Sequence, residues 1–198
     1  MLSAEVFHVF EKGKTIKGFS FEDLHMHSQL TAKIAASLLP ASPTRDAAII
    51  AGLLHDIGKL ILATRSPQHF ARAIDGSRVE KTPLYLEEQQ LMGVTHAEVG
   101  AYLLGLWGLP SPVVEAVAHH HVPGRIPGGS LDAVGAVHIA NVLANEHPVY
   151  PPAKEPLPHQ NIDTDFISAL GIAEQSAHWE ELAKAASQGL RAPATVAR

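Results

Sequence analysis

Three observations on the sequence predict an all-α protein. Apolar residues recur at helical spacing through most of the 198-residue chain, prolines and glycines punctuate these segments, and no stretch alternates apolar and polar residues as a strand would. Hydrophobic residues make up 46% of the composition, which is enough to bury a core. The expected architecture is therefore a helical bundle.

The predicted helices of the first half are separated by proline and glycine. Pro40 stops an amphipathic helix. The next helix starts near Pro43 and is apolar nearly all round, so we expect it to be buried in the centre of the bundle. Gly76 and Gly93 follow two shorter helices and end them. The predicted ranges are Ala4–Phe10, Phe21–Leu39, Pro43–Ala63, Pro67–Ile74 and Leu84–Met92.

The second half begins with a strong start signal. Thr95 followed by Glu98 matches the capping box, in which the two side chains satisfy the first free amides of a helix. The predicted helices here are Thr95–Trp107, Pro112–His121, Leu131–Asn145, Thr164–Leu170 and Glu174–Gln188. We expect a helical domain over residues 1–147. Residues 148–198 should form a proline-rich connector and C-terminal helices that pack on that domain.

The composition excludes several classes of protein. Because the chain has no cysteine, zinc fingers, iron–sulfur clusters and thiol nucleophiles are excluded. The net charge is −5 with no basic block, so a nucleic-acid polymer is not expected as the partner. The sequence shows no uninterrupted apolar run of about 18 residues and no secretion signal. We therefore expect a cytoplasmic protein without a membrane partner.

The 13 histidines are the unusual feature, and some of them fall on apolar faces of the predicted helices. These are His27, His96, His120 and His121, while His55-Asp56 lies within the most apolar helix. Asp56 shares a helical face with Ile49, Leu53 and Leu60, where a carboxylate is costly unless a cation or hydrogen-bond donors meet it.

One inward histidine is usually a satisfied core residue. Inward histidines on four helices together with an inward aspartate favour a His/Asp metal centre inside the bundle. The histidines expected at the surface are His8, His25, His69, His119, His147, His159 and His178.

In their order along the chain, these residues resemble the HD superfamily of metal-dependent phosphohydrolases, and within it the HDOD (HD-related output domain) group. The resemblance extends over roughly residues 5–147. It rests on His27-Ser28, the run Gly52–Leu60, Glu88, the run His96–Leu104, Trp107–Pro110, His120–Pro123 and Val137–Asn141.

The resemblance implies a site for a divalent metal ion, either Fe, Mn, Mg or Zn. In it His27, His55 and Asp56 would hold one ion, with Asn141 or a water completing the shell. The residues that would hold a second ion or bind phosphate are His96, His120 and His121. Lys59, one turn after His55, would stabilise negative charge developing on a phosphate ester.

Two departures from the pattern bear on function. Asn141 stands where the HD pattern has a final aspartate, which removes a negative charge from the site. No Gly-Tyr-Pro follows His120-His121, so the signature of cyclic di-GMP hydrolases is missing. We favour a signal-transduction output domain, acting through a protein partner or an upstream receiver domain of a response regulator. The alternatives are a phosphohydrolase acting on nucleotides or cyclic dinucleotides, and a nucleotide sensor without turnover.

Overall fold

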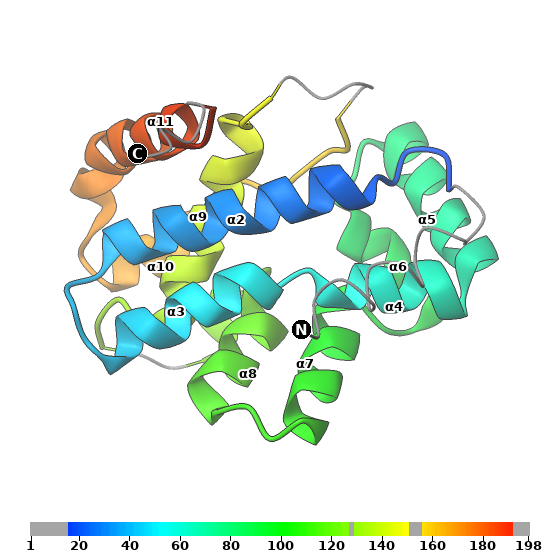
Figure 1. Ribbon diagram of the computed structural model, residues 1–198, viewed down its shortest axis with the longest axis horizontal. Coiled ribbons are helices and arrows are strands. Elements are labelled where there is room, and N and C mark those ends of the chain that lie inside the picture. The colour runs from blue at the N-terminus through cyan, green and yellow to red at the C-terminus, as the bar shows by residue number, and fades with distance from the viewer. Residues whose placement is uncertain (1–15, 127–128, 151–155, 192–198) are drawn as a thin grey trace, which may run out of the picture.

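A computed structural model describes residues 16–126, 129–150 and 156–191 (Figure 1). These residues form α-helices and two short 3-10 helices, and no strand occurs among them. The all-α prediction is confirmed. The helices are α2 (Phe21–Leu38), α3 (Pro43–Leu54), α4 (Ile57–Arg65), α5 (Pro67–Glu80), α6 (Leu84–Met92), α7 (His96–Leu106), α8 (Ser111–His119), α9 (Ala133–Glu146), α10 (Thr164–Ala169) and α11 (Ser176–Arg191), with 3-10 turns at Pro123–Arg125 and Ala173–Gln175.

Helix α9 is the buried centre of the molecule. Every residue from Ala133 to Ala144 is buried. Helices α2, α3, α8 and α11 pack against it, and Trp179 of α11 is buried in the same apolar core (Figure 1). A second, smaller core around Phe70 joins α4, α5 and α6, and α4 also packs on α7. The predicted helix Ala4–Phe10 lies outside the described residues.

The prediction of one continuous central helix over Pro43–Ala63 is wrong. The chain turns at His55-Asp56 and divides the segment into α3 and α4. Both turn residues are buried, with 0% and 2% of their surface exposed. Helix α3 is also not central, because Ile50 and Leu53 are 41% and 46% exposed. The apolar periodicity continues through the turn, so hydrophobicity alone gave no sign of it.

One helix end also differs from its prediction. Helix α5 runs past Gly76 to Glu80 and ends at Lys81, which adopts a left-handed conformation with φ 54°. A side chain at Gly76 would approach the carboxylate of Glu87 on α6 to 2.7 Å, so this glycine permits close helix packing. By contrast, Leu84–Met92 has the predicted bounds, and Gly93 terminates it with φ 70°. The capping box of Thr95 and Glu98 is present as predicted.

By length and composition alone, the stretch Pro43–Arg65 is apolar enough to cross a membrane, with a mean hydropathy of 1.6. This corrects the expectation that no such stretch exists. About two-fifths (39%) of its most apolar window is buried within the fold, and the turn at Asp56 interrupts it. Core helices of water-soluble proteins pass the same test, so the finding is weak evidence for a membrane span.

Gly58 allows α4 to lie directly on α7, and this contact can be tested. A Cβ atom at position 58 would overlap the backbone carbonyl of His96, which has little freedom to move. We expect Gly58→Ala to lower the free energy of unfolding by about 1–3 kcal/mol. A matched control is Gly105→Ala, because nothing lies within 4 Å of a Cβ there. In urea titrations the control should be neutral or gain about 0.5–1 kcal/mol from helix propensity. Equal effects of the two substitutions would contradict the close contact.

Candidate metal centre

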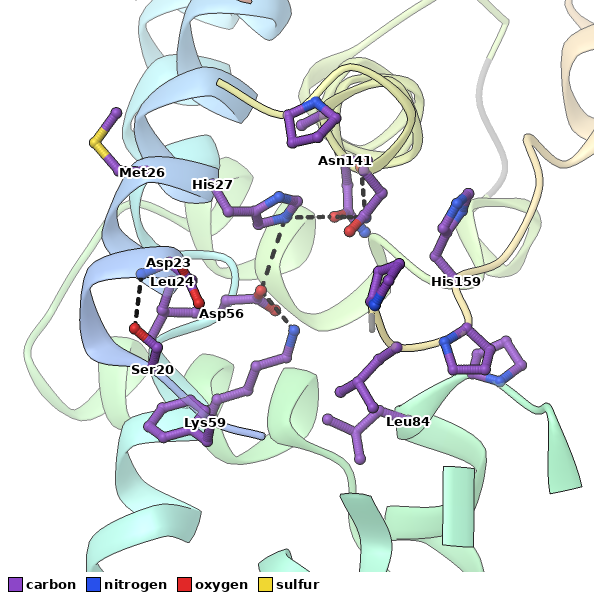
Figure 2. Close-up of a pocket in the computed structure, with 18 of the residues that line it drawn as sticks. Ser20, Asp23, Leu24, Met26, His27, Asp56, Lys59, Leu84, Asn141 and His159 are labelled. Carbon is purple, nitrogen blue, oxygen red and sulfur yellow. Dashed lines mark hydrogen bonds and ion pairs between the residues drawn. The ribbon is translucent and has the colours of Figure 1, made fainter. Parts of the chain in front are cut away.

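The structure brings the predicted site residues together around the carboxylate of Asp56. Figure 2 shows four of them, His27, Asp56, Lys59 and Asn141. Each comes from a different place in the bundle. His27 projects from α2, and His55-Asp56 form the turn between α3 and α4. Lys59 follows on the first turn of α4, His96 begins α7, His120-His121 follow α8, and Asn141 is on α9.

The first group consists of His27, His55 and Asp56, whose ligand atoms all lie within 4.8 Å of one another. Oδ2 of Asp56 is 3.4 Å from Nε2 of His55 and 3.9 Å from Nε2 of His27. The two imidazole nitrogens are 3.3 Å apart. Lys59 donates to the same carboxylate oxygen at 2.6 Å.

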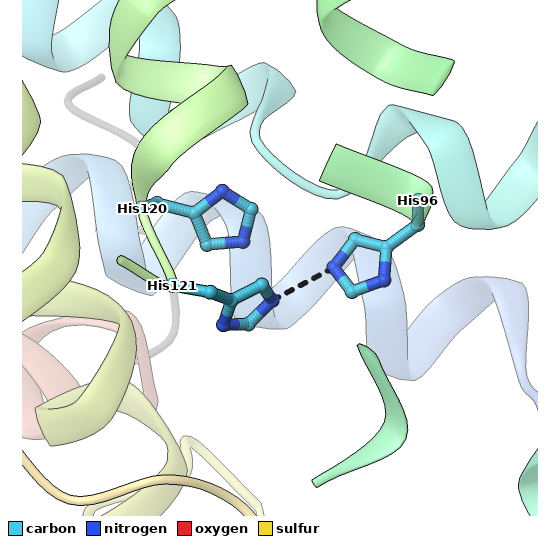
Figure 3. A group of neighbouring side chains, drawn as sticks. All are labelled: His96, His120 and His121. Carbon is cyan, nitrogen blue, oxygen red and sulfur yellow. Dashed lines mark hydrogen bonds between the residues drawn. The ribbon is translucent and has the colours of Figure 1, made fainter. Parts of the chain in front are cut away.

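The second group consists of His96, His120 and His121, again with ligand atoms within 4.8 Å (Figure 3). Nε2 of His96 and Nε2 of His121 are 3.0 Å apart. Oδ1 of Asp56 faces this group, 3.1 Å from Nε2 of His96 and 4.0 Å from Nε2 of His120. Asp56 therefore stands between the two groups with one oxygen toward each.

In four of the histidine rings, Nδ1, the nitrogen that points away from Asp56, donates a hydrogen bond to an acceptor of the protein. Nδ1–H of His55 donates to the carbonyl of Gly52 at 2.9 Å, and Nδ1–H of His120 donates to the carbonyl of Val117 at 2.8 Å. The acceptor for His96 is the carboxylate of Glu88 at 2.6 Å, and that for His121 is Oε1 of Gln160 at 2.9 Å. In each neutral ring the proton is therefore on Nδ1, and Nε2 presents a lone pair toward the centre.

This donor set fits a divalent metal ion. Lone pairs of imidazole nitrogens repel one another and repel a carboxylate, yet Nε2 of His96 and Nε2 of His121 lie 3.0 Å apart and Nε2 of His55 lies 3.4 Å from Oδ2 of Asp56 in a buried space. Nε2 of His120 and Oδ1 of Asp56 have no hydrogen-bond partner of good geometry among the described residues. Cations relieve such an arrangement, and neutral imidazole with a second hydrogen-bonded nitrogen is the usual metal ligand.

Burial also favours the neutral form of three imidazoles of the site, those of His27, His120 and His121. Burial and the neighbouring His55 lower the pKa of His27 to about 3. Burial, followed by the adjacent histidines, holds the pKa values of His120 and His121 well below the ordinary value. Burial alone would lower the pKa of His96 too, but the carboxylate of Glu88 outweighs it and raises that pKa.

Asp56 is ionised despite being buried. Burial alone would raise the pKa of this carboxyl, but His55 and Lys59 outweigh that effect and hold the pKa well below its usual value. Asp56 is therefore a permanent negative charge at the centre of the site.

Asn141 occupies the edge of the first group. Its Oδ1 accepts from His27 Nε2 at 2.9 Å, and Asn145 donates to the same oxygen at 3.3 Å. The amide is placed where a further ligand to this group would lie, but it is neutral and already engaged.

Three supporting residues were missing from the predicted site. Glu88 is fully buried and binds both the backbone amide and the ring of His96. Tyr85 stacks on His121 with ring centroids 4.2 Å apart, and Gln160 holds the other nitrogen of that ring. Glu88 is among the residues that carry the family resemblance, but no role at the site was predicted for it. Gln160 lies in the segment predicted to be a connector, and nothing in the sequence marks it.

A cavity of about 680 Å³ opens onto the first group (Figure 2). Its floor includes His27, Asp56 and Lys59, and its walls come from α2, α5, α9 and the chain around Pro148 and Leu157. The volume is in the range of pockets that hold small organic ligands.

Some of the histidines expected at the surface are exposed in the structure and others are half-buried. His25, His69, His159 and His178 are exposed, whereas His8 lies outside the described residues. His119 is half-buried and its Nδ1 lacks a partner among the described residues, so its expected exposure is wrong. It is the last residue of α8. His147 is also half-buried and pairs with Glu180 at 2.6 Å.

Comparison with known proteins finds the HDOD domain family over residues 1–123. An uncharacterized protein of Treponema pallidum (strain Nichols) is 29% identical over 107 residues, which are 52% of this chain and 21% of that protein. The chain thus spans about a fifth of the length of this relative.

Solved structures share the fold. An HDOD domain protein of unknown function from Geobacter sulfurreducens aligns with a TM-score of 0.69 at 20% identity, over 93% of this chain and 67% of that one. A candidate phosphohydrolase from Shewanella amazonensis SB2B gives 0.59 at 20% identity, over 92% and 68%. The MmoQ response regulator from Methylococcus capsulatus strain Bath gives 0.54 at 19% identity, over 86% and 64%.

The family match covers more than half of the sequence, and the HD-type histidines and aspartate lie together in the predicted bundle. The chain belongs to the HDOD domain family.

Proposed function

We propose that this protein is a signal-transduction output domain whose bundle holds divalent metal ions beneath a ligand pocket. One observation carries the proposal: Nε2 atoms from both histidine groups converge on the buried carboxylate of Asp56. His27, His55 and Asp56 would hold one ion, and His96, His120 and His121 a second. Bound ions would supply positive charge to a phosphate group and lower the pKa of a coordinated water.

The donor set narrows the choice among Fe, Mn, Mg and Zn. Five imidazoles and one carboxylate are available, and imidazole suits Fe and Zn, whereas Mg prefers oxygen ligands. We therefore expect Fe or Zn rather than Mg.

The pocket chemistry favours a ligand that carries phosphate. Lys59 lies on the floor, with its ammonium group oriented by Asp56. Arg78 of α5 lies on the wall and makes no hydrogen bond or ion pair with the described residues. Two cations beside a metal centre attract an anionic group, and apolar wall residues such as Leu24 and Leu84 would contact the organic part.

An exposed apolar patch supports an action through a protein partner. Tyr102, Leu106 and Trp107 at the end of α7 are 71%, 67% and 61% exposed. Patches of this kind on a soluble domain are typical of protein contacts. The likeness to a response regulator is consistent with an attached receiver domain as that partner.

Phosphohydrolase activity is the second candidate, and the position of Lys59 favours it. This cation and Asp56 line the open pocket beside histidines of both groups, where Lys59 would face a phosphate ester. The neutral Asn141 weakens the case, because it leaves Asp56 as the carboxylate of the first group.

Metal binding can be tested directly. We expect elemental analysis of the purified chain, or titration with Zn²⁺, to give about two ions per chain. Chelation should lower the melting temperature, because at a free metal concentration of 100 times Kd each site adds about 2.7 kcal/mol of stability. His55→Ala should remove the ion of the first group, whereas His69→Ala at an exposed position should not. A wild-type chain that binds no metal and is unaffected by chelation would refute the proposal.

Asn141 is expected to limit the first metal site. Asn141→Asp adds a charged ligand beside His27, so we expect metal affinity there to rise at least about tenfold. Calorimetric titration of the variant and the wild type would measure this affinity.

Hydrolysis of a chromogenic phosphodiester by the wild type, lost in Asp56→Ala and reduced in Lys59→Met, would favour the enzyme over the output domain.

The low pKa of His27 predicts a pH dependence for the metal-free protein. A histidine whose pKa is about 3 when folded but about 6.5 when unfolded stabilises the fold above pH 6.5. That contribution is lost as the pH falls from about 6.5 towards about 3. In urea titrations with chelator between pH 7 and pH 4, His27→Gln should lose stability less steeply than wild type, by up to about 1.4 kcal/mol per pH unit. The exposed variant His69→Gln should keep the wild-type slope, and a His27→Gln slope equal to it would contradict the prediction.

A further inference from the structure

The C-terminal segment 156–163 is hydrogen-bonded to the second histidine group. Oε1 of Gln160 accepts from Nδ1–H of His121 at 2.9 Å. Nε2 of the same Gln160 side chain lies 3.0 Å from Nδ1 of His138. The proton on that nitrogen already goes to the carbonyl of His120, so the bond to His121 is the stronger anchor of Gln160.

A second connection runs through His138, which is fully buried on α9. Its Nδ1–H donates to the carbonyl oxygen of His120 at 2.8 Å, and its Nε2 accepts the backbone amide of Asp163 at 2.9 Å. The Asp163 side chain in turn caps α10 by accepting from the amide of Phe166. Both His120 and His121 are thus tied to the same short segment.

The bond from Gln160 depends on the tautomer of His121. A metal ion on Nε2 requires the proton of that ring to be on Nδ1, where Oε1 of Gln160 accepts it. Without the ion, His121 can carry its proton on Nε2 and donate to His96, which is 3.0 Å away. Nδ1 then has a lone pair, and it repels the carbonyl oxygen of Gln160.

We propose that the order of segment 156–163 depends on whether the second histidine group holds a metal ion, and that the His121–Gln160 hydrogen bond couples the two. The inference rests on the proposed metal centre. Metal on His121 favours the ordered segment, and by thermodynamic reciprocity the ordered segment favours metal binding. Gln160 acts as a positioning residue for His121.

The location of the segment suits a signalling output. Leu157 and Gln160 line the pocket, so the segment contacts the space in which a ligand would lie. The same segment leads into α10, whose Phe166 contacts His138 of α9, and then into α11, which packs on α2 and α9. A change in its order therefore reaches the C-terminal helices, beyond the residues 1–123 that match the family.

Hydrogen exchange of the full chain with and without Zn²⁺ tests the inference, read at the Asp163 amide. In the wild type we expect Zn²⁺ to slow exchange there at least about fivefold. Gln160→Met removes the acceptor and should abolish this difference, whereas Gln160→Glu keeps an acceptor oxygen and should restore it. Gln90→Met, the same change at an exposed position on α6, should behave as wild type. Titration of Gln160→Met should also show weaker binding of one Zn²⁺ ion and unchanged binding of the other.

The outcomes separate the two proposals. A wild type that binds no Zn²⁺ overturns the metal centre and the coupling together. Zn²⁺ binding without any change at Asp163 overturns the coupling and leaves the metal centre intact. Zn²⁺-dependent protection that persists in Gln160→Met would show that another route orders the segment, and this too overturns the coupling.

Discussion

The buried charge of Asp56 is the constraint on which the rest of the structure depends. Its side chain is 2% exposed and remains ionised, so the fold must place compensating groups around it. Lys59 supplies one charge at 2.6 Å, and the histidines of both groups surround the carboxylate, where a metal ion would add positive charge. The chain forms no continuous helix here, because it turns at His55-Asp56 to place the Asp56 carboxylate among these groups. The glycine at position 58 then lets α4 close onto the backbone of His96.

Local signals in the sequence predicted much of the fold because they act within a few residues. The capping box at Thr95 and the glycine after Met92 specify helix ends by hydrogen bonds and backbone conformation that need no distant partner. The turn at Asp56 has no such signal. It is stabilised by contacts with three other helices, and the hydrophobic pattern runs through it unchanged.

Burial was misjudged for a related reason. Helix α3 carries apolar residues on nearly all of its faces, yet its Ile50 and Leu53 are exposed. The buried helix is α9 instead. Helix α9 is rich in small residues such as Gly135 and Ala140, which let neighbouring helices approach from every side. A side chain at Gly135 would lie 2.8 Å from Phe166. Helix size, rather than hydrophobicity alone, decides which helix can occupy the centre. The site residues were easier to predict than their supports, since Gln160 meets His121 only after the C-terminal segment has folded back.

In the proposed metal centre, the neutral Asn141 would shift the electrostatic balance towards binding rather than turnover. With an aspartate there, two carboxylates would share the first metal ion and offset more of its charge. With the neutral amide, Asp56 is the carboxylate that both groups share, and a loaded centre would keep a larger positive charge facing the pocket. Such a centre holds its metal less tightly but attracts a phosphate group more strongly. Because Lys59 and Arg78 add positive charge to the same pocket, an anionic ligand would be retained rather than released, which suits a domain that reports a bound ligand.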